Sequence, residues 1–178
     1  MKSCNETLIY LKELEIDDVT NEYVNWLNDK DVNQFLETRF NEQNLTTVNQ
    51  FVSSMVDSET NKVFTIRTTL DDKHIGNVKI GNIQEKHALA ELSLFIGDKF
   101  YWGKGVGTKA IELAIEHAFK KLNLRKLSAG IYINNHASLK SFLKAKFKIE
   151  AEFIDHYMLD DDYCSIYYLT LFNLSYSK

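Results

Sequence analysis

The chain has 178 residues, of which 44% are hydrophobic and 26% charged, with seven glycines, no proline and a formal charge of -4 at pH 7. This length suits one domain, residues 1–178, and the apolar content excludes disordered and low-complexity classes. Acidic residues outnumber basic ones, which is not typical of a nucleic-acid binder. No apolar run reaches the roughly 20 residues that span a bilayer, and the N-terminus does not resemble a signal peptide. We therefore expect a cytoplasmic protein without a membrane or nucleic-acid partner.

Cysteine and histidine usage predicts neither a disulfide nor a metal site. Cys4 and Cys164 lie far apart in sequence and match no metal-ligand spacing, so both are expected to be free thiols in a reducing compartment. The five histidines form no H-E-x-x-H or comparable pair, and no metal cofactor is predicted.

The first half of the chain predicts strands mixed with two helices. A helix is expected through Tyr23–Leu27, capped by Asp17 or Asp18, and another over Thr46–Val56, capped by Thr46 or Thr47. β-Branched and aromatic runs separated by turn residues predict the strands, which are Leu8–Leu11, a hairpin of Val63–Thr68 with Ile75–Ile83, and Leu89–Ile96.

The second half predicts a strand-helix-strand crossover and a closing hairpin. The apolar stripe of Thr108–Leu122 indicates the strongest helix of the chain. It is followed by an expected strand Leu127–Ile133, a short helix Ser138–Lys144, and strands Phe147–Ile154 and Tyr163–Phe172. This order predicts an α/β fold of the α+β kind, with a mixed, largely antiparallel sheet of about seven strands and about four flanking helices.

One motif carries clear chemistry, the glycine-rich turn Trp102-Gly103-Lys104-Gly105-Val106-Gly107-Thr108 between a strand and an amphipathic helix. Glycines allow main-chain N–H groups to approach a ligand closely, and a helix N-terminus carries a partial positive charge. Together these features favour a phosphate or diphosphate site. The alternative is a turn that merely permits tight packing.

Two familiar phosphate-binding motifs do not fit this turn. A Walker loop ends in Gly-Lys-Ser/Thr, whereas the order here is Gly107-Thr108-Lys109. A dinucleotide fingerprint follows the first strand of its unit and needs an acid at the end of the next strand. Here the motif comes late, and the next strand ends at Asn134.

The segment Glu91–Phe147 resembles the acetyl-CoA core of the GNAT family of N-acetyltransferases. The family pattern Arg/Gln-x-x-Gly-x-Gly/Ala is matched at Gly105 and Gly107, with Trp102 in place of Arg or Gln. Asn135-x-x-Ser138 and the following Phe142-Leu143-Lys144-Ala145-Lys146-Phe147 resemble the branch of ribosomal-protein N-terminal acetyltransferases, although Lys146 replaces the usual glycine.

This resemblance implies an acetyl-CoA site between splayed fourth and fifth strands. The pantetheine arm is expected to lie along the free edge of the fourth strand at Leu94, Phe95 and Ile96. The N–H groups of Gly103, Lys104, Gly105, Val106 and Gly107 would hold the diphosphate, with Trp102, Thr108 and Asn135 as further cofactor-binding residues. Lys104 and Lys109 are candidates for the 3′-phosphate, and the alternative is that both are simply solvated.

The resemblance also implies direct attack of a neutral amine on the thioester. Glu91, at the start of the fourth strand, is the candidate base, and the alternative is an exposed strand residue. Many family members donate a proton to the thiolate from a tyrosine at the position of Phe142, which has no proton to give. Ser138 is the first replacement candidate and Tyr132 the second. A helix cap is the plainer role for Ser138.

The sequence constrains the identity of the acceptor amine less than that of the acetyl donor. Residues Trp26–Phe40 resemble enzymes of bacterial surface-glycan pathways that acetylate nucleotide-linked amino sugars. Arg39 is a candidate for a forked phosphate contact, Glu37 for contact with a sugar hydroxyl or amine, and Trp26, Phe35 and Phe40 for stacking, against the alternative of ordinary packing. A protein N-terminal α-amine or another small amine remains open as acceptor, and so does a non-catalytic CoA-binding module. Either a monomer or a homodimer fits.

Overall fold

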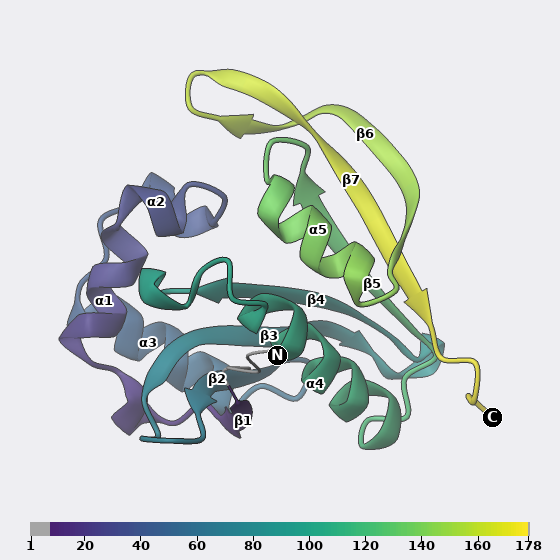
Figure 1. Ribbon diagram of the computed structural model, residues 1–178, viewed down its shortest axis with the longest axis horizontal. Helices are drawn as coiled ribbons and strands as arrows, with labels where there is room; N and C mark the ends of the chain where they lie inside the picture. The colour runs from purple at the N-terminus through teal and green to yellow at the C-terminus, as the bar shows by residue number, and fades with distance from the viewer. Residues whose placement is uncertain (1–7, 178) are drawn as a thin grey trace, which may run out of the picture.

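The computed structural model describes residues 8–177 as a mixed seven-stranded sheet with helices on both faces (Figure 1). Strand order is β1-β2-β3-β4-β5-β7-β6, and every neighbouring pair is antiparallel except β4–β5. The strands are β1 Ile9–Glu13, β2 Lys62–Thr68, β3 His74–Gln84, β4 Leu89–Ile96, β5 Lys126–Tyr132, β6 Lys148–Leu159 and β7 Asp162–Phe172. The predicted fold class is confirmed.

Five α-helices and four 3-10 turns connect the described strands. The helices are α1 Asn21–Asn28, α2 Lys30–Asn33, α3 Leu45–Val56, α4 Val106–Lys120 and α5 His136–Lys144, and the turns are η1 Ile16–Asp18, η2 Glu37–Phe40, η3 Glu85–His87 and η4 Lys99–Tyr101. The four-residue α2 is the helix that the estimate of about four did not include. No helix of the described residues is long and apolar enough to cross a membrane. Cys4 lies outside residues 8–177, and Cys164 is a buried free thiol.

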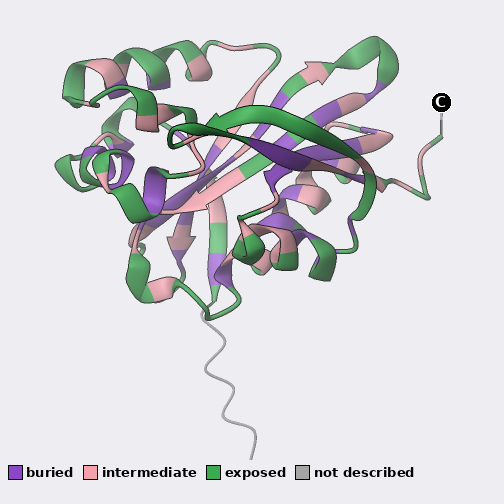
Figure 2. Cartoon of the chain, turned by 90° about the horizontal axis from the view of Figure 1, so that it is seen from above, coloured by how far each residue is buried: buried purple, intermediate pink, exposed green. Residues whose placement is uncertain are grey.

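Two apolar clusters lie on opposite faces of the sheet. Helices α4 and α5 pack on one face, through side chains such as Ile111 and Phe142. Helices α1 and α3 pack on the other, against Val63 and Phe95 of the sheet. Figure 1 shows α1–α3 gathered beside β2 and β3, while α5 lies beside β5 and β7. The edge strand β6 is exposed along most of its length, as Figure 2 shows in green.

The predicted helix caps were wrong, because neighbouring polar residues are used elsewhere. Thr20, and neither Asp17 nor Asp18, caps α1 by accepting a hydrogen bond from the N–H of Tyr23. Asn44 caps α3, while Thr47 closes the reciprocal bond of a capping box. Asp18 instead turns inward and is only 4% exposed.

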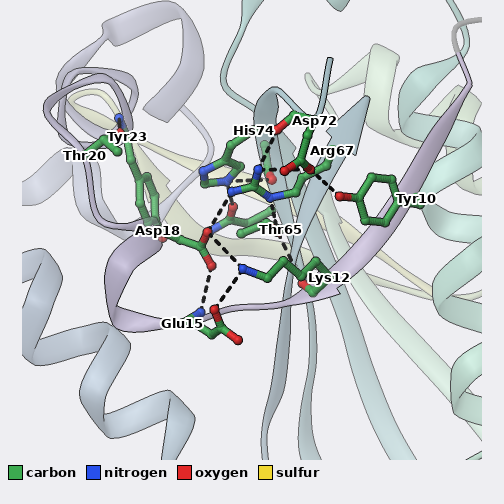
Figure 3. Close-up of polar contacts among 12 residues, drawn as sticks. Tyr10, Lys12, Glu15, Asp18, Thr20, Tyr23, Thr65, Arg67, Asp72 and His74 are labelled. Atoms are coloured by element: carbon green, nitrogen blue, oxygen red, sulfur yellow. Dashed lines mark hydrogen bonds and ion pairs between the residues drawn. The ribbon is translucent and has the colours of Figure 1, made fainter. Parts of the chain in front are cut away.

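Asp18 belongs to a polar cluster on the sheet face beneath α1 (Figure 3). Nη2 of Arg67 donates to Asp18 at 2.8 Å, and the Arg67 side chain also pairs with Asp72. His74 lies beside the cluster, where its ring packs edge-on to Tyr23 and Trp26. These charges satisfy one another, which is what burial of ionised groups requires.

The central strands β4 and β5 pair over three positions only. The pairs are Leu89–Lys126, Ala90–Leu127 and Glu91–Ser128, after which no ladder joins them. The remainder of β4, Leu92–Ile96, pairs with β3 alone, so its other edge is free within the described residues. The predicted splaying of the fourth and fifth strands therefore begins after Glu91.

Candidate active site

The glycine turn presents a row of unpaired main-chain donors. Gly103 and Gly105 adopt left-handed φ values of 71° and 81°, which glycine tolerates best. Gly105 is the N-cap of α4 and has no side chain to accept from the first turn. The N–H groups of Gly103, Lys104 and Gly105 make no main-chain hydrogen bond among residues 8–177, and those of Val106–Thr108, in the first turn of α4, are N–H groups that a helix leaves without an intrahelical partner. With no acidic side chain in the first turn of α4, this arrangement suits an anion with several oxygens.

The side chains around the turn hold its shape. Nε1 of Trp102 donates to the carbonyl oxygen of Ile96 at 2.8 Å, linking the turn to the end of β4. Nζ of Lys104 lies 3.3 Å from the ring centre of Phe100, a cation–π geometry, and Nζ of Lys109 lies 3.8 Å from Glu112. These contacts leave the main-chain donors open.

Residues Leu94, Phe95 and Ile96 line the free part of β4. Leu94 and Ile96 pack toward the α4 cluster, whereas Phe95 faces the opposite side and stacks on Tyr23 with ring centres 6.2 Å apart. A ligand along this edge would therefore meet main-chain N–H and C=O groups rather than these side chains.

Glu91 stands at the last β4–β5 pair, opposite Ser128. Its side chain is exposed, and one carboxylate oxygen accepts a 3.2 Å hydrogen bond from Nδ2 of Asn82. The candidate base therefore lies where the two strands begin to part.

The first turn of α5 separates the roles of Asn135 and Ser138. Oδ1 of Asn135 accepts from the N–H of Ser138 at 3.1 Å, so Asn135 is the cap. The Ser138 hydroxyl makes no hydrogen bond within the described chain, so the structure does not support the alternative in which Ser138 only caps the helix. Phe142 is 2% exposed and packs edge-on against Phe147, with ring centres 5.0 Å apart.

Arg39 is committed to the protein's own groups, which corrects its prediction as a forked phosphate contact. Its Nη1 donates to Leu36 O at 2.7 Å, and Nη2 donates to the Tyr132 phenol at 2.8 Å and to Met158 O at 2.7 Å. The side chain is 11% exposed, and Nε is buried without a hydrogen-bond partner. Arg39 therefore joins η2 to β5 and β6.

Tyr132 is 7% exposed, between this guanidinium and two aromatic rings. Its ring centre lies 5.6 Å from that of Phe35 and 5.8 Å from that of Tyr157. Burial raises the pKa of the phenol above its ordinary value, and the hydrogen bond from Arg39 partly opposes that rise.

Of the remaining predicted acceptor residues, Trp26 is a packing residue rather than a stacking platform. It is 7% exposed, and a Cβ on Gly97 would lie 2.1 Å from its ring. Phe40 is exposed and lies under the Arg39 guanidinium at 4.1 Å, while the exposed Glu37 is 3.6 Å from Arg39. Glu37 and Arg39 thus form the surface pair that was the alternative reading.

Sequence reasoning missed two backbone requirements in this region. Gly97 directly follows the predicted strand Leu89–Ile96, and nothing in the local sequence indicates that the bulk of Trp26 requires a glycine there. Lys146 adopts a φ of 73°, which explains why glycine is usual at that position in the resembling family. The sequence shows that lysine replaces the usual glycine at position 146, but it does not show the backbone strain that this residue carries.

Comparison with known proteins agrees with the fold and the turn. A family model described as an acetyltransferase (GNAT) domain matches residues 9–148. The spermidine N(1)-acetyltransferase of Escherichia coli (strain K12) is 28% identical over 106 residues, covering 60% of this chain and 56% of that protein. The acetyltransferase PseH of Campylobacter jejuni is 28% identical over 134 residues, covering 74% and 78%.

A solved structure extends the similarity over nearly the whole chain. The spermidine N-acetyltransferase of Vibrio cholerae in complex with CoA and spermine superposes with a TM-score of 0.85, covering 94% of this chain and 97% of that one at 19% identity. At that identity the likeness shows the fold alone. The chain spans just over half the length of the Escherichia coli relative that it matches.

Proposed function

Because the chain belongs to the acetyltransferase (GNAT) domain family, we propose that it is an acetyl-CoA-dependent N-acetyltransferase acting on a primary amine. One observation carries the proposal. A row of open main-chain donors from Gly103 to Thr108 lies at the end of a strand whose free edge begins after Glu91. A diphosphate and an extended amide-bearing arm need this pair of features, because both are bound through main-chain hydrogen bonds.

The residues present fit acetyl-CoA as cosubstrate. The N–H groups of Gly103–Gly107 would bind the diphosphate, and the free edge of Leu94–Ile96 would pair with the pantetheine amides. Gly103 and Gly105 have no neighbour within 4 Å of a built Cβ, so space is open on the ligand side of the turn. Metal chemistry is not part of the proposed step.

Proton transfers in the reaction are assigned to side chains near the parting strands. The acceptor ammonium loses a proton to Glu91, directly or through water, and the neutral amine then attacks the thioester carbonyl. Main-chain N–H groups on the free edge of β4 stabilise the oxyanion. We assign thiolate protonation to Ser138, whose hydroxyl has no other hydrogen bond among residues 8–177, with Tyr132 as second candidate.

For the acceptor we propose an amino sugar linked to a nucleotide. The proposal rests on residues 26–40, which resemble enzymes of that kind and form α2 and η2, held against β5 and β6 by Arg39. A polyamine or another small amine is the second candidate, favoured by the spermidine-acetylating relatives. A protein N-terminal α-amine and a module that binds CoA without turnover are further outcomes of the test.

Calorimetry with acetyl-CoA, followed by thiol-release assays, tests these proposals. We expect saturable binding of acetyl-CoA and CoA release with nucleotide-linked amino sugars. Turnover restricted to spermidine and related amines would replace the acceptor by the second candidate, and turnover restricted to short peptides by an α-amine. Binding without turnover across the panel would leave a CoA-binding module. No heat with acetyl-CoA at millimolar ligand would overturn the enzyme proposal.

A further inference from the structure

One face of the half of the sheet formed by β5, β7 and β6 is only partly covered: Phe35, between α2 and η2, packs over Tyr132 and Ile166, but Gly130 on the same side stays exposed. Helix α5 packs on one side of β5 and β7, through Leu139 and Phe142 against Ile131 and Leu169. On the opposite side, Gly130 is exposed, although it lies inside β5 and both of its chain neighbours pair with β7. Figure 1 shows α1 and α3 on the other half of the molecule, whereas the α2–η2 segment reaches β5 and β6 through Phe35 and Arg39.

Strand register identifies the side chains on this open face. Gly130 pairs with Tyr168, and Tyr168 pairs with Ala151, so all three point to the same side of the sheet. Tyr168 is therefore flanked by two residues without bulk, and its half-buried ring meets Phe153 edge-on with centres 5.9 Å apart. We call Gly130, Ala151, Phe153 and Tyr168 the Tyr168 face.

The Tyr168 face lies on the same side of the sheet as the candidate base. Glu91 pairs with Ser128, and side chains of paired strand residues share a face. Ser128 and Gly130 are two residues apart on β5, so their side-chain positions also share that face, roughly 7 Å apart along the strand. A group lying over Gly130 is thus beside the point where β4 and β5 part.

Charge on this side favours an anion next to the aromatic ring. Lys148 pairs with Thr170, which pairs with Ser128, so Lys148 points to the same side as Tyr168. No carboxylate lies within 4.0 Å of Lys148 among residues 8–177, whereas Lys126 is bonded to Glu150 at 2.7 Å. Lys148 is therefore, within the described residues, an unpaired cation beside the aromatic ring of Tyr168. This combination complements a ligand in which a phosphate is attached to a ring.

We infer that the Tyr168 face binds the sugar ring of an aminohexose whose anomeric carbon carries a phosphate, as in the nucleotide-linked acceptor proposed above. The ring lies over Gly130 with its apolar C–H face against Tyr168, its amine toward Glu91 and its anomeric phosphate toward Lys148. Burial of an apolar ring face against an aromatic side chain is favourable, and the phosphate adds a charge interaction. An aliphatic polyamine has no ring to use this face and is repelled by Lys148. The inference rests on the proposed function and narrows its acceptor.

Filling the space over Gly130 tests the inference directly. Gly130→Leu places bulk on the face, whereas Gly130→Ala adds a single methyl group that meets only Ile166 Cδ1 at 3.5 Å, an ordinary contact, so the loss should grow with the size of the side chain. The probes are 2-amino- and 4-aminohexose 1-phosphates, their unphosphorylated sugars and spermidine. We expect Gly130→Leu and Tyr168→Ala to lower kcat/KM for the phosphorylated sugars at least tenfold.

Two further variants separate the face from general damage. Lys148→Gln should raise KM for the phosphorylated sugars about tenfold without changing that for the unphosphorylated ones. Tyr163→Ala removes an exposed aromatic side chain of β7 that points to the other side of the sheet. It should leave the KM for phosphorylated and for unphosphorylated sugars unchanged. The affinity for acetyl-CoA, measured by calorimetry, should stay within twofold in all variants. If the unmodified chain did not bind acetyl-CoA at all, the proposed function would fail, whatever the result for the Tyr168 face.

Three results would overturn the inference. The first is unchanged sugar-phosphate kinetics in Gly130→Leu or no turnover of any sugar phosphate. The second is preferred turnover of spermidine that Gly130→Leu does not affect. The third is a dimer in sedimentation velocity that Tyr168→Ala dissociates, since a second copy of the chain would then cover the face.

Discussion

Nη2 of Arg39 donates a 2.8 Å hydrogen bond to the phenol oxygen of Tyr132, 93 residues further along the chain. The same nitrogen also donates to Met158 O, so one side chain joins the turn η2 to both β5 and β6. Removing it would leave a phenol and two carbonyl groups without this donor.

We therefore expect Arg39→Ala to lower the free energy of unfolding by about 2–4 kcal/mol, since several hydrogen bonds from one charged donor, two of them partly buried, are lost together. Urea denaturation measures the change. Arg125→Ala is the matched control, because Arg125 is also half-buried but only approaches the ring of Phe172, and it should cost less than about 1 kcal/mol. Equal losses in the two variants would contradict a specific role for Arg39.

Gly105→Val should reduce acetyl-CoA affinity at least tenfold. A β-branched residue is strained at the φ of 81°, and its side chain would stand in the open space where the diphosphate is proposed to bind. Gly107→Ala is the control, because Gly107 has no positive φ and a Cβ there meets only Ser141 Oγ at 3.6 Å. Calorimetry compares the two, and equal affinity in Gly105→Val and the unmodified chain would place the diphosphate elsewhere.

Lys146→Gly should stabilise the protein by about 1 kcal/mol. Lys146 follows α5 in the left-handed region, where a non-glycine residue pays about 1–2 kcal/mol of backbone strain, partly offset by the greater freedom of glycine in the unfolded chain. Lys140→Gly inside α5 is the opposite control and should destabilise by about 1 kcal/mol. Thermal and urea unfolding measure both changes, and destabilisation in both variants would refute the strain argument.

Glu91→Gln should lower kcat with little change in acetyl-CoA affinity, because the amide cannot take the acceptor proton. The pH–rate profile is the deciding measurement, and a profile identical to that of the unmodified chain would remove Glu91 from the reaction. Ser138→Ala provides the companion measurement. It should slow turnover without loss of stability, because Asn135 supplies the cap. Full activity in Ser138→Ala would move the proton-donor role to Tyr132.

Stability should fall on mild acidification through His74. Burial lowers the pKa of this imidazole below its ordinary 6.5, against a smaller opposing effect of the hydrogen bond with Asn77. The unfolded chain therefore binds a proton first as pH drops below 6.5, and the free energy of unfolding decreases until the folded-state pKa is passed. His74→Gln should flatten the dependence between about pH 7 and pH 5 in urea titrations. Parallel curves for the two proteins would assign the acid sensitivity to other groups.

Local pattern predicted most of the elements. Leu89–Ile96 matches β4 at both ends, because apolar alternation and the following Gly97-Asp98 are local signals. The helix caps were missed for a non-local reason, since Asp18 is drawn into the sheet by Arg67, 49 residues away. Thr20 was left to cap α1, and nothing in the spacing distinguishes these two polar residues.

The candidate site likewise contains residues whose roles follow from local sequence and residues whose roles depend on distant segments. The positions of Gly103 and Gly105 were readable because positive φ values and an uncapped helix start are properties of adjacent residues. The role of Arg39 was not readable, because its acceptors come from three segments that meet only after the sheet has formed. No local sequence signal distinguishes Tyr168 from the other aromatic residues of β7. Its place opposite Gly130 depends on strand register, which the sequence did not specify.

The Trp26 ring occupies the volume that a side chain at position 97 would need. Trp26 belongs to helix α1, whereas Gly97 directly follows β4, the strand proposed to carry the thioester arm. Anyone who exchanges residues 20–40 with those of another enzyme to alter its selectivity must therefore transplant the amino acid at position 97 as well. A smaller residue in place of Trp26 would leave a cavity beside β4. A larger residue at position 97 would clash with Trp26 and displace helix α1.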